Sequence, residues 1–189
     1  MERHIESMMD DSTVFITPIG SRLYGLENAN SDYDYLKVTS RIVRKNTHSV
    51  HDEFDIRVFS WFSLFEMLMK KPTHTGYEAL MSPIKAYGPM ADQYMPFLNS
   101  YRPGMSALLK TFISAALGTL AVKDEDKFKR FRLGLLLAEN FNEACENEGR
   151  YNPSLNDREA SELTARAEAL FARPEDERPG IIREAFGMY

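Results

Sequence analysis

The amino-acid sequence predicts an α+β protein, in which a small mixed β-sheet core flanked by helices is followed by an all-α C-terminal half. Two observations carry this prediction. Short runs that alternate apolar and polar residues, typical of half-buried strands, occur only before Pro72. Beyond Pro72 the apolar residues recur at helical spacing. We therefore expect two domains, residues 1–85 and residues 86–189.

Three strands are expected in the first domain. Residues 14–19 form a β-branched and aromatic run that ends at Gly20, with Pro18 at a strand end or a bulge. Residues 32–38 and 54–59 each alternate polar and apolar side chains, as half-buried strands do.

Helices are expected over residues 61–71, 77–81, 105–122, 126–146 and 157–171. Ser60 is a suitable N-cap for the first, and Asn156 or Asp157 for the last. The first helix would present a single apolar face made of Phe62, Phe65, Leu68 and Met69. A polar linker over residues 173–179 would precede a last short helix.

Composition excludes several classes of protein. Hydrophobic residues make up 43% and charged residues 27% of the 189 residues, as in ordinary globular proteins. The single cysteine, Cys145, excludes an internal disulfide and is expected to be buried. The net charge of −5 argues against non-specific DNA binding, which needs many basic contacts to phosphates. No run is apolar enough to span a membrane, and no apolar leader opens the chain, so we expect a cytoplasmic protein.

The most informative segment is residues 19–35. A predicted strand ends at Gly20 and Ser21, and after ten intervening residues a second strand begins with Asp32 and Asp34. Glycine lets backbone N–H groups approach an anion closely, and the serine hydroxyl is a further donor. Asp32 and Asp34 share one face of a strand, where they repel each other unless a cation lies between them. Carboxylate oxygens suit Mg²⁺ or Mn²⁺, so this pattern predicts a metal-bound nucleoside triphosphate.

Asp55 is the candidate third carboxylate of a two-metal site. Strand alternation places it on the polar face of residues 54–59, together with Arg57, which is a candidate nucleotide-binding residue. The three aspartates converge if these two strands are neighbours. The alternative is an exposed aspartate paired with Arg57.

The segment Gly20-Ser21-Arg22-x-Tyr24-Gly25, followed by Ser31-Asp32-Tyr33-Asp34, resembles the signature of the DNA polymerase β-type nucleotidyltransferases. Within that superfamily it resembles a group of predicted nucleotidyltransferases of bacteria and their phages. The similarity is strong over residues 14–60 and weaker to about residue 140, where Glu78, Ser82 and Pro83 match. Pro18 departs from the pattern, and residues beyond 150 have no match.

The resemblance implies a nucleotidyltransferase core with two Mg²⁺ (or Mn²⁺) ions and the transfer of a nucleoside monophosphate from a nucleoside triphosphate, with ATP as a candidate donor. Asp32, Asp34 and Asp55 would hold the metal that activates an acceptor hydroxyl, and Asp32 and Asp34 the one on the triphosphate. Gly20 and Ser21 would bind the β- and γ-phosphates, and pyrophosphate would leave.

Other residues have two interpretations each. Arg22 could hold a phosphate or form a surface salt bridge, and Tyr24 could stack on a base or pack the loop. Glu78 could belong to the site or cap a helix. A basic group could line a triphosphate or RNA groove or form a solvated helix face; its members are Lys127, Lys129 and Arg132. His48 and His51 fit surface residues better than a metal site, because zinc is the metal that histidine favours.

The acceptor stays open: an RNA 3′ end, a protein and a small molecule are all compatible with the sequence. The competing hypothesis is a nucleotide- or protein-binding module without turnover, such as an inhibitor, a sensor or a toxin–antitoxin partner. The presence of all three aspartates favours the enzyme. A phage-encoded protein of this kind would act in the host cytoplasm.

Overall fold

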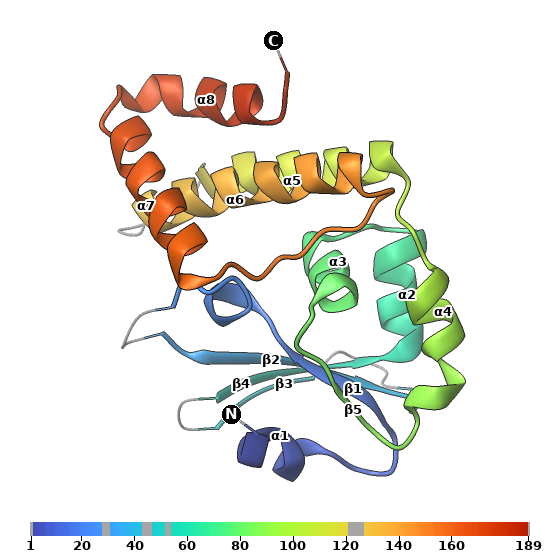
Figure 1. Ribbon diagram of the computed structural model, residues 1–189. Helices are drawn as coiled ribbons and strands as arrows, with labels where there is room; N and C mark the ends of the chain where they lie inside the picture. Colours follow the sequence, from blue (N-terminus) through green and yellow to red (C-terminus); the bar gives the residue numbers. More distant parts are fainter. Residues whose placement is uncertain (1, 28–30, 43–46, 52–53, 121–126, 189) are drawn as a thin grey trace. The chain divides into compact units, whose positions relative to one another are not determined.

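The computed structural model describes residues 2–27, 31–42, 47–51, 54–120 and 127–188. The fold is mixed α+β, as predicted, and the chain divides into two compact units, Met1–Tyr101 and Arg102–Tyr189 (Figure 1). The sequence placed this division earlier, near residue 85. None of the helices in the described ranges combines the length and apolar composition that a bilayer crossing requires.

The first unit contains a five-stranded mixed sheet in the order β3-β4-β2-β1-β5. Its strands are β1 (Thr13–Pro18), β2 (Tyr33–Thr39), β3 (Thr47–His51), β4 (Phe54–Ser60) and β5 (Ala86–Tyr87). The central pair, β2 and β4, is parallel, and the other neighbours are antiparallel. The three strands expected from the sequence correspond to β1, β2 and β4. Pro18 is the last residue of β1, where its missing N–H leaves no ladder position unfilled.

The two faces of this sheet are covered by different helices (Figure 1). Helix α1 (Glu2–Met8) lies on one face, where Ile5, Ile16 and Tyr35 form a small core. Tyr33 and Phe54 pack against that core, with ring centroids 5.3 Å apart. Because side chains alternate along a strand, Asp34 and Asp55 point to the opposite face, as predicted.

The opposite face carries α2 (Trp61–Met69), α3 (His74–Met81) and α4 (Met95–Ser100). Ser60 caps α2 as predicted, because its Oγ accepts the N–H of Ser63 at 3.1 Å. The predicted apolar face of α2 was wrong in part: Leu64 and Leu68 are buried, whereas Phe62 and Met69 are 58% and 52% exposed. Trp61 of α2 packs against Tyr94, with ring centroids 4.4 Å apart, and against Phe97 of α4.

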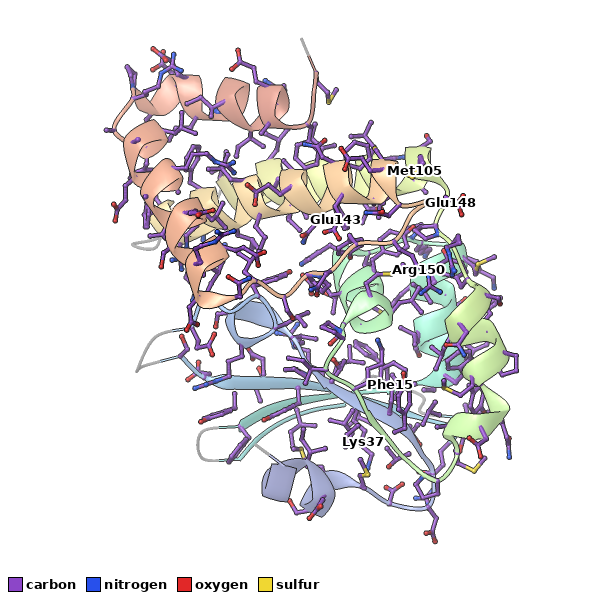
Figure 2. All side chains as sticks on the ribbon, viewed as in Figure 1. Phe15, Lys37, Met105, Glu143, Glu148 and Arg150 are labelled. Carbon is purple, nitrogen blue, oxygen red and sulfur yellow. The ribbon has the colours of Figure 1, made fainter. Side chains whose placement is uncertain are left out.

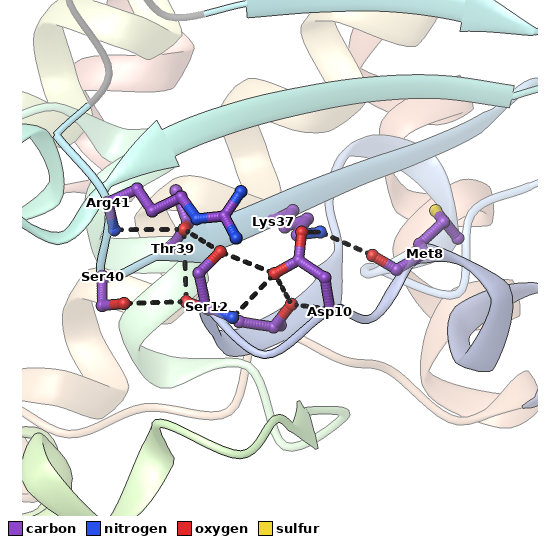
Figure 3. Close-up of polar contacts among 8 residues, drawn as sticks. Met8, Asp10, Ser12, Lys37, Thr39, Ser40 and Arg41 are labelled. Carbon is purple, nitrogen blue, oxygen red and sulfur yellow. Dashed lines mark hydrogen bonds and ion pairs between the residues drawn. The ribbon is translucent and has the colours of Figure 1, made fainter.

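A polar network fixes the entry into β1 (Figure 3). Asp10 Oδ1 accepts the N–H and the Oγ–H of Ser12 at 2.8 and 2.6 Å. Lys37 Nζ donates to Asp10 Oδ2 at 2.9 Å and to the carbonyl of Met8 at 2.6 Å. The hydrogen bond from Ser12, followed by that from Lys37, holds the pKa of Asp10 well below its usual range. This network ties the end of α1 to β2.

The described part of the second unit holds α5 (Met105–Leu120), α6 (Lys127–Glu146), α7 (Asp157–Phe171), the 3₁₀ turn η3 (Glu175–Glu177) and α8 (Arg178–Ala185). Helix α6 is central and contacts α5, α7 and α8. Asn156 begins α7 with a capping box that Glu159 completes. The linker expected over residues 173–179 was wrong, because η3 and the start of α8 occupy it. Cys145 is exposed rather than buried.

Candidate functional site

The loop after β1 brings a glycine against a carboxylate. Gly20 begins a single 3₁₀ turn, η1 (Gly20–Arg22), with a φ of +69° that favours glycine. The N–H of Ile19 donates to the carbonyl of Asp34 at 2.9 Å, which joins the loop to β2. A Cβ on Gly20 would lie 2.9 Å from Oδ2 of Asp34. The loop is therefore packed closely against the first carboxylate of β2.

Asp34 and Asp55 are partners in the parallel β2–β4 register. Because neighbouring strands lie about 4.8 Å apart, the two carboxylates are side by side on one face of the sheet. Oδ1 of Asp55 is buried. Asp32 is exposed and lies just before β2, two residues from Asp34. The structure thus brings together Gly20 and two of the three predicted aspartates.

This pair fits a site for one Mg²⁺, which proteins usually hold through one or two carboxylates with water and substrate phosphate completing the shell. Two adjacent carboxylates disfavour each other's charge unless a cation lies between them. Within the described ranges, no group of three or more His, Cys, Asp or Glu side chains is arranged to hold a metal ion. A second ion that also uses Asp32 stays a prediction.

Arg22 has a role that neither sequence interpretation foresaw. Its Nε donates to the carbonyl of Asp32 at 3.1 Å, and its Nη2 donates to the carbonyl of Ser31 at 2.7 Å. Its guanidinium carbon lies 3.5 Å from the ring centroid of Tyr33. Arg22 therefore fixes the backbone that enters β2, and so the position of Asp32.

The remaining predicted nucleotide-binding residues of the first unit differ in exposure. Ser21 is half-buried beside Gly20, and Arg57 is exposed two residues beyond Asp55 on the same face. Tyr24 is only 3% exposed, which favours its interpretation as loop packing over base stacking. The side chains of His48 and His51 lie outside the described residues.

The predicted basic group lies on α6 of the second unit, so its use by a triphosphate stays a prediction. Lys127 Nζ forms an ion pair with Glu175 Oε1 at 2.7 Å, and Arg132 Nη1 donates to Thr164 Oγ1 at 3.1 Å. Lys129 is exposed. Lys127 and Arg132 thus have partners within their own unit.

Glu78 of α3 is the most unusual titratable residue of the first unit. It is 3% exposed, and burial raises its pKa to about 8. Its Oε1 has no hydrogen-bond partner in the described part of the chain. His74 Nε2 lies 3.8 Å from that oxygen, and burial, together with the charge of Arg57, lowers the pKa of His74. Both side chains are therefore neutral at pH 7. Glu78 lies inside α3, so it does not cap a helix.

Lys85, near the end of α3, is a second residue whose pKa is shifted by burial. Its Nζ donates to the carbonyls of Leu80, at 2.8 Å, and of Ser82. Burial lowers its pKa to about 8. Sequence reasoning missed Lys85, because nothing in the local pattern marks a lysine that satisfies carbonyls at the end of a helix.

Replacing Gly20 by Ala is expected to weaken metal-dependent nucleotide binding. The new Cβ would push Asp34 aside, and the positive φ should lower the free energy of unfolding by about 1–2 kcal/mol. Gly118→Ala is the matched control, because nothing lies within 4 Å of its Cβ position on α5 and alanine favours a helix. Titration with a fluorescent ATP analogue and Mg²⁺ would measure the effect. Equal affinities for the two variants would contradict the role given to Gly20.

No known family model matches the chain, and a search of curated proteins gives no match either.

Proposed function

We propose that the first unit is a metal-dependent nucleotidyltransferase, which moves a nucleoside monophosphate from a nucleoside triphosphate to an acceptor hydroxyl. The observation that carries the proposal is the juxtaposition of Gly20 with Asp34, and of Asp34 with Asp55, on one face of the sheet. A glycine turn beside paired carboxylates offers backbone donors for phosphate and oxygen ligands for Mg²⁺. The resemblance of residues 19–35 to nucleotidyltransferases supports the same conclusion.

Each group has a distinct task in this proposal. Backbone N–H groups of the Gly20 turn and the hydroxyl of Ser21 would bind the leaving phosphates. Asp34 and Asp55 would hold a divalent cation that, when bound, neutralises the α-phosphate and acidifies the acceptor hydroxyl. The acceptor hydroxyl would lose its proton to water, and its oxygen would form a bond to the α-phosphorus. The bond between the α-phosphorus and the bridging oxygen would break, and pyrophosphate would leave with that oxygen. Arg22 would position Asp32 through its backbone carbonyl.

A nucleotide-binding module without turnover is the second candidate. The observation that favours it is the exposed Asp32, which does not join the other carboxylates into a group of three within the described ranges. Such a module would bind a nucleoside triphosphate with Mg²⁺ at the same face but leave it intact.

Nucleotidyl transfer is tested by incubating the protein with each α-³²P-labelled nucleoside triphosphate, Mg²⁺ or Mn²⁺, and total cell extract. The products are separated into RNA, protein and small molecules. We expect label on one of these classes with wild type and with Asp92→Asn, an exposed control, but not with Asp34→Asn. Metal-dependent nucleotide binding without transfer would support the second candidate. The absence of both would overturn the proposal.

A further inference from the structure

A cavity of about 510 Å³ lies within the second unit, formed by α6, α7 and the segment between them. Its size falls in the range of small-molecule sites. Figure 2 labels one of its residues, Glu143, on α6. The acidic and basic lining residues are Glu139, Glu143, Glu159, Glu162 and Arg166. No residue proposed for nucleotidyl transfer lines it.

Asn140 offers a polar group to a ligand in this cavity. The residue lines the cavity although it is only 3% exposed. Within the described ranges no residue hydrogen-bonds to its side chain, and its amide atoms are not among the fully buried atoms that lack a partner, so the amide is open to the cavity. A ligand with N–H donors would satisfy the amide oxygen of Asn140.

The charge of the lining residues favours a cationic ligand. The lining contains four carboxylates and one guanidinium, and that guanidinium, of Arg166, forms an ion pair with Glu139. Glu143 accepts the N–H of Asn152 with both oxygens, each at 3.2 Å. A neutral backbone amide holds this carboxylate in place without cancelling its charge.

The remaining carboxylates are held in a similar way. Glu159 accepts the N–H of Asn156 at 2.9 Å in the capping box of α7. Glu162 lies 3.5 Å from Arg158, which is not a lining residue and is largely exposed, so the pair is screened by water. The lining therefore carries a net negative charge, and backbone N–H groups hold Glu143 and Glu159 in place.

The volume and the lining of the cavity favour an organic cation over a metal ion. In the described residues, no three acidic side chains are arranged for a metal, and the volume far exceeds that of a bare ion. Leu155 and Leu163 contribute an apolar wall, and Leu163 is 3% exposed. A ligand in which methylene groups separate two or more ammonium groups would match a lining that contains both carboxylates and leucine side chains.

We propose that this cavity binds an aliphatic polyamine. Glu143 and Glu139 contact ammonium groups, Asn140 accepts one N–H, and Leu155 and Leu163 pack on the methylene chain. This site is independent of the proposed nucleotidyl transfer, and its test measures binding rather than activity.

Binding of spermidine to the full-length chain, measured by isothermal titration at fixed ionic strength, tests the proposal. We expect Glu143→Gln and Asn140→Leu each to weaken binding by about tenfold. Glu143→Gln keeps an oxygen for the N–H of Asn152, so it preserves the fold. Glu146→Gln is the matched control, because it removes an equal charge from an exposed position on the same helix.

The control should bind spermidine within about twofold of wild type. An equal loss in Glu146→Gln and Glu143→Gln would mean that only net charge matters, and would overturn the proposal. Displacement of spermidine by Mg²⁺ at matched ionic strength would also overturn it. If Asn140→Leu fails to fold, the comparison between the two glutamate variants decides.

Discussion

The Asp34→Asn variant is expected to transfer nucleotide more slowly than wild type by a factor on the order of 10³. Asp34 lies close to the Gly20 turn and is the register partner of Asp55, so it links the proposed phosphate-binding turn to the second carboxylate. Asparagine has nearly the same shape but carries no charge, so the cation would lose a ligand without a change in packing. Steady-state transfer with saturating Mg²⁺ measures the effect.

Unfolding separates a role in the site from a role in the fold. Without Mg²⁺, Asp34→Asn should raise the free energy of unfolding by about 0.5 kcal/mol, since it removes a like charge beside Asp55. With Mg²⁺ and nucleotide, wild type should gain stability and the variant should not. Trp61 is the single tryptophan and belongs to the first unit, so its fluorescence reports on this unit. A variant that keeps the wild-type transfer rate would refute the assignment of Asp34.

The Glu78→Gln variant is expected to be more stable than wild type at pH 8 by an amount on the order of 4 kcal/mol, and nearly equal at pH 4.5. Burial raises the pKa of Glu78 from 4.5 to about 8, so the folded state holds a proton that the unfolded state releases. Wild-type stability therefore falls as pH rises through this window, by about 1.4 kcal/mol per pH unit. Glutamine resembles the protonated acid at every pH and removes this loss.

Urea unfolding followed through Trp61 between pH 4.5 and 8 measures the difference. His74 and Lys85 are present in both proteins, so their own titration cancels when the two curves are subtracted. Glu66→Gln on α2 is the control: its side chain is 43% exposed, and the change should stay within about 0.5 kcal/mol. Parallel stability curves for wild type and Glu78→Gln would show that Glu78 is not buried as a neutral acid.

Strands and helices were predicted where a short stretch of sequence carries the whole signal, such as polar–apolar alternation or an N-cap residue. The alternation in residues 54–59 and the β-branched run before Gly20 gave β4 and β1, and Ser60 and Asn156 marked the beginnings of α2 and α7. Helix α1 and strand β3 were missed. Helix α1 is short, and its buried residue Ile5 packs against Ile16 and Tyr35 of the sheet, which are distant in the sequence.

Residue types and spacing were enough to predict the chemistry of the candidate site, because Gly20, Ser21, Asp32 and Asp34 lie within one short segment. Which residues lie beside them depends on tertiary contacts. The parallel pairing of β2 with β4 placed Asp55 beside Asp34, and packing buried Glu78 and Tyr24. Hydrogen bonds from Arg22 to two carbonyls, and the amide of Asn140 in a cavity, also depend on contacts distant in sequence. Residue types and spacing are local properties, whereas burial and register arise only when distant segments exclude water together.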